Sequence, residues 1–186
     1  MAKLIIPHGN AQEKAVFEKF GIRLIEALSP EEFEKVAAAY ISTHNVLNLA
    51  TCRDNEPRCT TLEYFNNGLT VYIMSEGGSK ILSIQKNPRV SFTINDPYAP
   101  EKDYLSASGL QVWGSASIFK KHDDPARARE VQKYFRNSRA VAEQGLEQMV
   151  NLVNFNIITI VPHMIRYLDL RKGFRNVVWE KEQQAR

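Results

Sequence analysis

The sequence predicts an α+β fold in which six or seven antiparallel strands form a small closed or split β-barrel. Three observations support this prediction: a helical periodicity in residues 11–43, a run of short strands from residue 44 onward, and one helical interruption before the last strands. The connections between the predicted strands are short. They favour antiparallel neighbours, because parallel strands need a long crossover.

Bulk composition is typical of one globular domain. The chain has 186 residues, of which 44% are hydrophobic and 24% charged, so we expect a single domain over residues 1–186. No segment is long and apolar enough to cross a bilayer, and the start, MAKLIIPHGNAQEK, lacks a signal-type hydrophobic region, so we expect a cytoplasmic protein without a membrane partner. The net charge of +3 comes from interleaved basic and acidic residues, which argues against nucleic acid and fits a small anionic ligand.

The leader, residues 11–43, is predicted to be helical. Apolar residues recur with a helical period from Ala11 to Ala27, although Gly21 can divide this stretch in two. A second helix begins with Ser29 as N-cap, Pro30 at the first helical position and acidic residues in the first turn.

The barrel core, residues 44–120, contains five predicted strands. They read VLNLATCR, RCTTLEYFN, LTVYIMS, RVSFTIND and SGLQVWGSASIFK. All are rich in β-branched or aromatic residues, and the connections DNEP and NNG have turn composition.

The last third of the chain is predicted to be a helical excursion, residues 123–153, followed by closing strands within residues 155–180. The excursion opens with an Asp N-cap followed by Pro, and Gly145 can interrupt it. The closing strands read FNIITIVPHMIRYLDL and FRNVVWEK.

Cysteine and histidine spacing predicts no metal site. Cys52 and Cys59 do not form a C-x-x-C pair, and we interpret both as free thiols rather than as a disulfide or metal ligands. The four histidines are scattered along the chain without metal-ligand spacing.

The stretch GGSK, residues 77–80, is a candidate anion site. Gly77 and Gly78 permit positive φ and close approach to a ligand, and the helix that follows offers unpaired N–H groups. Ser79 adds a hydroxyl donor and Lys80 a full positive charge. The alternative is an ordinary turn with Ser79 as N-cap and Lys80 solvated. The order of these residues does not match a P-loop, and no G-x-G-x-x-G motif is present.

A second cationic group lies on the predicted strand over residues 58–64. Period-2 alternation places Arg58, Thr60 and Leu62 on one face. The opposite face carries Cys59, Thr61 and Glu63. Arg58 and Thr60 could offer a charge and a hydroxyl to one ligand, or Arg58 could be a surface residue of an edge strand.

The ordered stretches NLATCRDNEPRCTTLEYF, LTVYIMSEGGSKILSIQKNPRVSFTIND and LQVWGSASIF resemble the flavin-binding split-barrel family of pyridoxamine 5′-phosphate oxidase. The resemblance covers roughly residues 44–120, and IVPHMIRYLDL and VVWEKE match the family's closing strands. It implies an α+β fold with a six- to seven-stranded antiparallel split β-barrel, N-terminal helices, and a helical excursion before the last strands.

The resemblance also implies FMN as cofactor. Arg58, Ser79 and Lys80 match positions that hold the FMN phosphate. The strand segments that match the flavin-lining positions consist of Cys59, Thr60, Thr61, Leu62, Ile73, Met74 and Ser75. Gln111 lies two residues from a position where the family commonly has Gln. The family further implies a homodimer with two flavins at the subunit interface.

The resemblance implies an FMN-dependent oxidoreductase that works with a small-molecule electron donor or acceptor. Pyridoxamine phosphate is an unsuitable substrate, because Glu63 occupies the position of the family's substrate-binding Lys and GFRNVVW lacks an Arg-x-His motif. Tyr134 and Arg139 match substrate-side residues of the family, but they also fit an ordinary amphipathic helix. No residue is predicted to be a general acid or base.

Two other readings stay open. The chain could be a non-catalytic electron carrier, store or sensor that binds flavin or haem, with His122 or His163 as the haem ligand. A deazaflavin could also replace FMN, although the extra basic residues that its longer anionic tail would require are missing.

Overall fold

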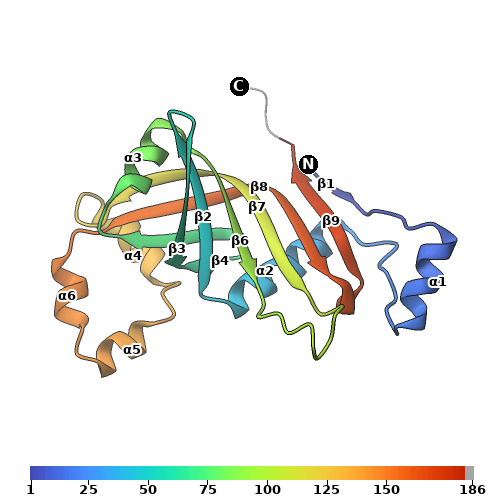
Figure 1. The fold of residues 1–186 in the computed structure, drawn as a ribbon. Helices are drawn as coiled ribbons and strands as arrows, with labels where there is room; N and C mark the ends of the chain where they lie inside the picture. The colour runs from blue at the N-terminus through green and yellow to red at the C-terminus, as the bar shows by residue number, and fades with distance from the viewer. Residues whose placement is uncertain (183–186) are drawn as a thin grey trace.

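The computed structural model describes residues 1–182 and confirms the predicted α+β fold class (Figure 1). The helices are α1 (Ala11–Lys19), α2 (Pro30–Thr43), α3 (Ser79–Lys86), α4 (Pro125–Gln132), α5 (Ser138–Glu143) and α6 (Glu147–Leu152), with a 3-10 turn at Leu170–Lys172. The strands are β1 (Ala2–Ile5), β2 (Val46–Arg53), β3 (Glu56–Glu63), β4 (Phe65–Asn67), β5 (Thr70–Ser75), β6 (Arg89–Asn95), β7 (Ser108–Lys120), β8 (Asn156–Asp169) and β9 (Phe174–Lys181).

All strands within residues 1–182 belong to one antiparallel sheet in the order β1-β9-β8-β7-β6-β2-β3, with β5 added to β8 and β4 added to β5. The long strand β8 organises this sheet. Strand β7 pairs with β8 over nearly its whole length, while the other edge of β8 pairs first with β5 and then with β9. The sheet therefore divides into two parts along β8. The part that includes β5 and the start of β8 is curled, and its opposite edge is β3.

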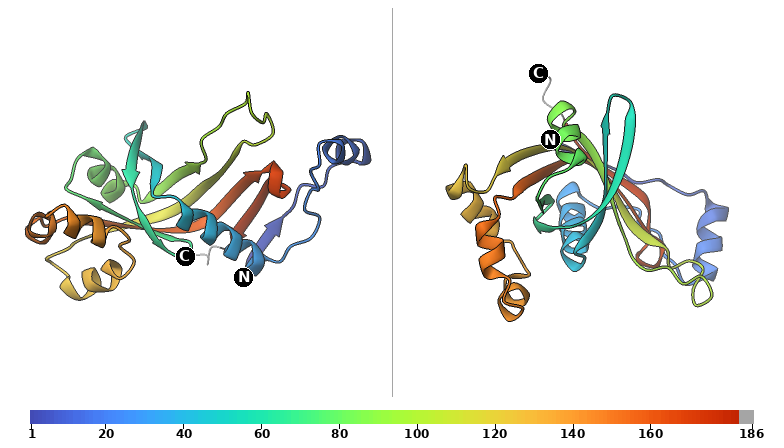
Figure 2. Two further views of the ribbon diagram at one scale, coloured as in Figure 1. Left: turned by 90° about the horizontal axis from the view of Figure 1, so that it is seen from below. Right: turned by 60° about the vertical axis from the view of Figure 1, so that its left-hand side comes forward.

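The core lies between the curled sheet and α2. Helix α2 begins as predicted, with a capping box between Ser29 and Glu32 and with Pro30 in its first turn. Phe33, Ala37 and Ile41 of α2 are fully buried against strand residues. Burial of a large apolar side chain stabilises the fold by about 1.5–3 kcal/mol, so this face fixes α2 to the barrel (Figure 2).

The barrel is split between β3 and β5. The chain runs almost directly from β3 into β4, and β4 pairs with β5 from Phe65 opposite Tyr72 to Asn67 opposite Thr70. The preceding residues of β3 pair only with β2, and the end of β5 pairs only with β8. The seam is closed at β4 and open towards the start of α3.

The structure corrects and extends details of the prediction. The four-residue strand β1 was not predicted, and the predicted strand RCTTLEYFN is divided at Tyr64 into β3 and the three-residue strand β4. The first helix ends at Lys19, because Gly21 adopts φ of +71° and the amide of Ile25 bonds to the carbonyl of Gly173. The excursion consists of three short helices at one end of the molecule, and α1 lies at the other end (Figures 1 and 2).

No helix in the described part of the chain has the length and apolar character needed to span a membrane. Within residues 1–182, no group of three or more His, Cys, Asp and Glu side chains is arranged to hold a metal ion.

Candidate functional site

The open end of the seam brings together the predicted cationic groups, and we call Arg58 and residues 77–80 the mouth. The Arg58 guanidinium donates a hydrogen bond to Ser79 Oγ, although the two residues lie 21 positions apart. Extending the β4–β5 register would bring Arg58 opposite Ser79. This contact therefore spans the split where the backbones of β3 and β5 no longer pair.

Gly78 shapes the mouth. It is the N-cap of α3, with φ of 95° and ψ of −178°, and no side chain caps the helix. This backbone region is accessible essentially only to glycine. Ser79 is thus the first helical residue rather than the N-cap, and its hydroxyl is free to contact Arg58. The first amide groups of a helix have no intrahelical acceptor and favour an anion.

The carbonyl groups at and next to the mouth already accept hydrogen bonds within the chain. Asn156 Nδ2 donates to the carbonyls of Ser75, at 3.3 Å, and Glu76, at 3.1 Å. The carbonyl of Gly77 accepts from Ser75 Oγ at 3.2 Å and from Lys80 Nζ at 2.9 Å. Carbonyl oxygens would repel an anion, so these bonds leave the mouth rich in donors.

A further hydroxyl lies behind Arg58. Thr51 is opposite Arg58 in the β2–β3 register and is 4% exposed, and its Oγ1 has no hydrogen-bond partner within residues 1–182. A buried unpaired hydroxyl is costly and calls for a partner. Guanidinium, ammonium, hydroxyl and helix-start amides together suit a phosphate group, whose oxygens are strong acceptors. Sequence reasoning missed Thr51, because only the strand register places it beside Arg58.

The predicted flavin-lining residues lie on the two facing edges of the split. Those on β3 are Cys59, Thr60, Thr61 and Leu62, and those on β5 are Ile73, Met74 and Ser75. Thr60 and Leu62 are half-buried, whereas Ile73 points into the core with no exposed surface. An unpaired strand edge presents free backbone N–H and C=O groups, so these segments offer a ligand mainly their backbones.

Three predicted residues make their contacts away from the mouth. Gln111 is an exposed residue of β7, between Thr93 and Arg166 in the sheet register. The Tyr134 ring stacks on Tyr72 with centroids 5.9 Å apart, and the Tyr134 hydroxyl accepts from Asn67 at 2.9 Å. Arg139 lies on α5 and forms an exposed ion pair with Glu143 at 2.7 Å. Neither Tyr134 nor Arg139 is therefore part of the mouth of its own chain.

A β-bulge directs His163 to the outer face of the sheet. Trp113 pairs with Met164 and Gly114 with Pro162, which leaves His163 as the extra residue of β8. A Cβ atom on Gly114 would lie 2.7 Å from the carbonyl oxygen of Val161, so only glycine fits there. His163 and Trp113 border a mostly apolar hollow of about 410 Å³.

A second polar cluster lies at the end of the barrel away from α3, where β6 ends. The Asp96 carboxylate accepts hydrogen bonds from the Tyr40 hydroxyl at 3.0 Å and from Ser108, and His44 Nε2 lies 3.0 Å from it. Burial favours the neutral carboxyl, but the bonds from Ser108, His44 and Tyr40 outweigh it and lower the pKa of Asp96. Burial raises the pKa of Tyr40 well above its ordinary value. We call these four residues the far-end cluster.

Comparison with protein families and curated proteins gives two matches. A family model described as pyridoxamine 5′-phosphate oxidase matches residues 33–169. An uncharacterized protein of Rhizobium meliloti (strain 1021) is 34% identical over 82 residues, which are 44% of this chain and 51% of that protein. The match thus spans about half the length of the curated relative.

Solved structures share the fold at low sequence identity. A heme binding protein from Mycobacterium smegmatis aligns with a TM-score of 0.56 and 20% identity, covering 82% of this chain and 58% of that one. A FAD-binding protein from Mesorhizobium loti aligns with a TM-score of 0.53 and 17% identity, covering 83% of this chain and 96% of that one. The fold is thus found in proteins with different ligands.

Proposed function

The chain belongs to the pyridoxamine 5′-phosphate oxidase family, and from this membership we propose that it is an FMN-binding flavoprotein that acts as an FMN-dependent oxidoreductase. The observation that carries the proposal is the mouth of the split, where Arg58, Ser79 and Lys80 gather at a glycine-capped helix start. Their donors suit a phosphate, and the free strand edges beside them suit a ring system with polar edges.

The FMN phosphate would be held by Arg58, Lys80, the Ser79 hydroxyl and the first amides of α3. Charge-assisted hydrogen bonds of this kind contribute about 1.5–3 kcal/mol each. The neighbouring carbonyls are already bonded to Asn156, Ser75 and Lys80, so little reorganisation would be needed when the anion binds.

The flavin ring would lie along the split. Backbone groups of residues 59–62 and 73–75 would bond its polar edge, since these edges have no strand partner within residues 1–182. When bound, FMN supplies hydride or single-electron transfer. The protein's part is to bind and orient it, because the mouth contains no carboxylate or imidazole placed for acid–base catalysis in the described chain. We expect a small cytoplasmic electron donor or acceptor.

The position of Gln111 supports a homodimer. Gln111 and Trp113 are on the outer face of β7, and Gln111 makes no contact with the mouth of its own chain. If Gln111 serves a flavin, it does so in the site of a second copy. A cofactor site that uses strands of both copies would explain why the predicted residues are divided between the mouth and the sheet face.

Pyridoxamine phosphate is not the substrate that we propose. The Glu63 carboxylate stands where the family's substrate-binding Lys would lie, and it accepts a hydrogen bond from Asn137. A fixed negative charge there would repel a substrate phosphate. The substrate class is therefore better sought among uncharged or cationic electron acceptors.

Haem binding without catalysis is a second candidate, and His163 is the observation that favours it. The His163 imidazole borders an apolar hollow with Ala50, Val90 and Trp113, and neutral imidazole is a common iron ligand. Thr51, which lies opposite Arg58, also lines this hollow, but Arg58, Ser79 and Lys80 do not, so the two candidates predict different main binding residues.

The visible absorption spectrum of the purified protein tests both candidates. We expect flavin bands that release free FMN on denaturation, or that appear when FMN is added. A haem Soret band that disappears in His163→Ala would favour the second candidate. A colourless protein that ignores added FMN would contradict the proposed function.

A further inference from the structure

The turn that leads from β5 into α3 carries a run of unpaired backbone amides. Within residues 1–182, none of the five amides of residues 76–80 donates a hydrogen bond. The first amides of any helix lack an intrahelical acceptor, but the amides of Glu76 and Gly77 precede α3 and are unpaired for another reason. Successive N–H groups in a turn form a concave anion site when they point to the same side. The direction of these two amides therefore decides whether they serve the mouth.

Asn156 controls this direction, because its side chain continues the β5–β8 ladder beyond its last pair. That pair joins Ser75, the end of β5, to Asn156, the start of β8, and Glu76 lies beyond the ladder. Asn156 Nδ2 donates to the Ser75 carbonyl at 3.3 Å and to the Glu76 carbonyl at 3.1 Å. The second bond is the only one that the Glu76 carbonyl accepts in the described part of the chain. The side chain thus directs a peptide unit that the backbone ladder does not reach.

The amides of Glu76 and Gly77 point into the split. The C=O and N–H groups of a trans peptide unit point in opposite directions, and no described peptide bond is cis. The end of β5 has β8 along one edge and the split along the other. Because the carbonyls of Ser75 and Glu76 are turned towards Asn156 on β8, the amides of the same peptide units face the split, where Arg58 lies.

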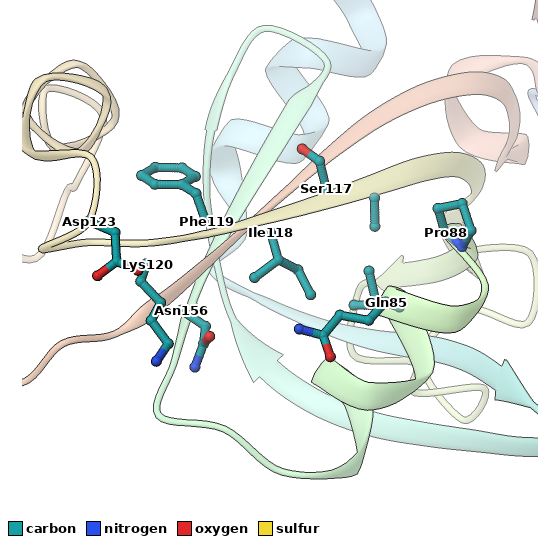
Figure 3. Close-up of a pocket in the computed structure, with 10 residues that line it drawn as sticks. Gln85, Pro88, Ser117, Ile118, Phe119, Lys120, Asp123 and Asn156 are labelled. Carbon is teal, nitrogen blue, oxygen red and sulfur yellow. The ribbon is translucent and has the colours of Figure 1, made fainter.

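Asn156 is held firmly in this position. It is only 8% exposed, and its backbone is paired with Ser75 on one side and with Lys120 on the other. Figure 3 shows its side chain beside Lys120, at the edge of a hollow of about 490 Å³ between α3, the end of β7 and the start of β8. A side chain fixed on a paired strand holds its partners more precisely than a side chain on a loop does.

We propose that Asn156 is a positioning residue of the mouth, an inference that rests on the proposed binding of the FMN phosphate there. By holding the Glu76 carbonyl, Asn156 turns the Gly77 amide towards the phosphate, next to the Glu76 amide. These two amides add to the donors of Arg58, Ser79 and Lys80. Asn156 acts through the backbone and does not itself contact the ligand.

A comparison of FMN with riboflavin tests the proposal, since riboflavin has the same ring system and lacks the phosphate. The ratio of the two affinities, measured by flavin fluorescence titration, reports what the phosphate contributes. Asn156→Leu keeps the approximate shape of the side chain and removes its donor, so it should lower this ratio by about tenfold. A merely structural role would weaken both flavins alike and leave the ratio unchanged.

Three further variants make the test independent of how one substitution folds. Asn156→Ala also removes the donor and should lower the ratio as Asn156→Leu does. Asn156→Gln keeps an amide donor, and the adjoining hollow has room for the longer side chain, so it should retain most of the ratio. Thr159→Val is the matched control, because Thr159 is a buried residue of the same strand whose hydroxyl makes no hydrogen bond within residues 1–182. Its ratio should equal that of the wild type.

A titration with inorganic phosphate, followed by the backbone amide signals in NMR spectra, detects the positioned amide directly. The Gly77 amide signal should shift in the wild type and stay in place in Asn156→Leu. A Gly77 amide that does not respond in the wild type would overturn the proposal. So would a wild-type ratio in Asn156→Leu and Asn156→Ala when Arg58→Ala/Lys80→Ala lowers it, although the proposed function would then stand. A wild type that binds neither flavin would contradict the proposed function itself, and this proposal with it.

Discussion

The two ends of the barrel use polar residues in opposite ways. In the far-end cluster, the Asp96 carboxylate is matched by donors from Tyr40 and Ser108 and by the imidazole of His44. At the mouth, Arg58 and Lys80 face hydroxyls and a carbonyl, and no carboxylate pairs with either of them within residues 1–182. A matched cluster stabilises the folded chain, whereas an excess of donors prepares the chain for an anion.

We therefore expect the far-end cluster to determine the stability of the fold and the mouth to determine ligand affinity. Removing a group from the far-end cluster leaves a partly buried partner without its hydrogen bond, which costs folding free energy. Removing a cation from the mouth relieves repulsion between like charges and takes away only what a bound phosphate would use. The following predictions test this separation, starting with the largest expected effect.

The double substitution Arg58→Ala/Lys80→Ala should weaken FMN binding on the order of 100-fold or more, since two charge-assisted interactions of about 1.5–3 kcal/mol each are lost. Flavin fluorescence titration measures the affinity, and urea unfolding measures stability, which should stay the same or rise slightly. The control is Lys102→Ala/Arg129→Ala, which removes the same charge from exposed positions elsewhere. Unchanged flavin affinity in the double mutant would remove both residues from the site.

Gly78→Ala should weaken FMN binding by roughly tenfold. The backbone of Gly78 lies in a region that costs a non-glycine residue on the order of 1–3 kcal/mol, and an added Cβ would lie 4.0 Å from Lys80 Nζ. The turn would shift and misalign the amides of α3. Gly77→Ala is the matched control, because open space surrounds its Cβ position and its φ is not positive. If both variants bind alike, the conformation of Gly78 has no role in binding.

Tyr40→Phe should lower the free energy of unfolding by about 1 kcal/mol and leave FMN affinity unchanged. The substitution removes one hydroxyl that donates to Asp96 while the ring stays packed against Tyr167, with centroids 5.2 Å apart. Urea unfolding and flavin titration on the same preparation give both quantities. A loss of flavin affinity without a loss of stability would contradict the separation of the two ends.

The mouth was partly predictable from sequence because its chemistry is local. Two glycines, a hydroxyl and a lysine at a helix start predict an anion site before any strand is paired, and the alternation of β3 predicts the face of Arg58. Most of the succession of helices and strands along the chain could be predicted for the same reason, since periodicity and turn residues are local signals.

The residues that sequence reasoning missed depend on register. Thr51 matters because it lies opposite Arg58, and Asn156 because it lies opposite Ser75. His163 was named from the sequence as a possible haem ligand, but only the bulge shows that it is the extra residue of β8. Each of these facts depends on how two distant strands are aligned, and a shift of one residue would turn the side chains to the other face. The far-end cluster likewise joins Tyr40 and Asp96, which are 56 positions apart.

The smallest expected effect is a change in the pH dependence of stability at the far end. The pKa of Asp96 is lowered in the folded protein, against burial, by bonds from Ser108, His44 and Tyr40. Its charge therefore stabilises the fold above the ordinary value of 3.8, and this contribution is lost as the pH falls through the lowered pKa. Asp96→Asn should be less stable than the wild type near neutral pH, and the difference should shrink steadily below about pH 4.

Urea unfolding of both proteins between pH 7 and pH 3 measures this difference. Because Asp96 is 39% exposed at its side chain, solvent screens its interactions and the gap should be modest. A gap that stays constant down to pH 3 would mean that the hydrogen-bond geometry of the cluster, rather than the charge of Asp96, supplies the stability. In that case the far-end cluster would stabilise the fold through its matched hydrogen bonds alone. Only the function of the mouth, anion binding, would depend on charge.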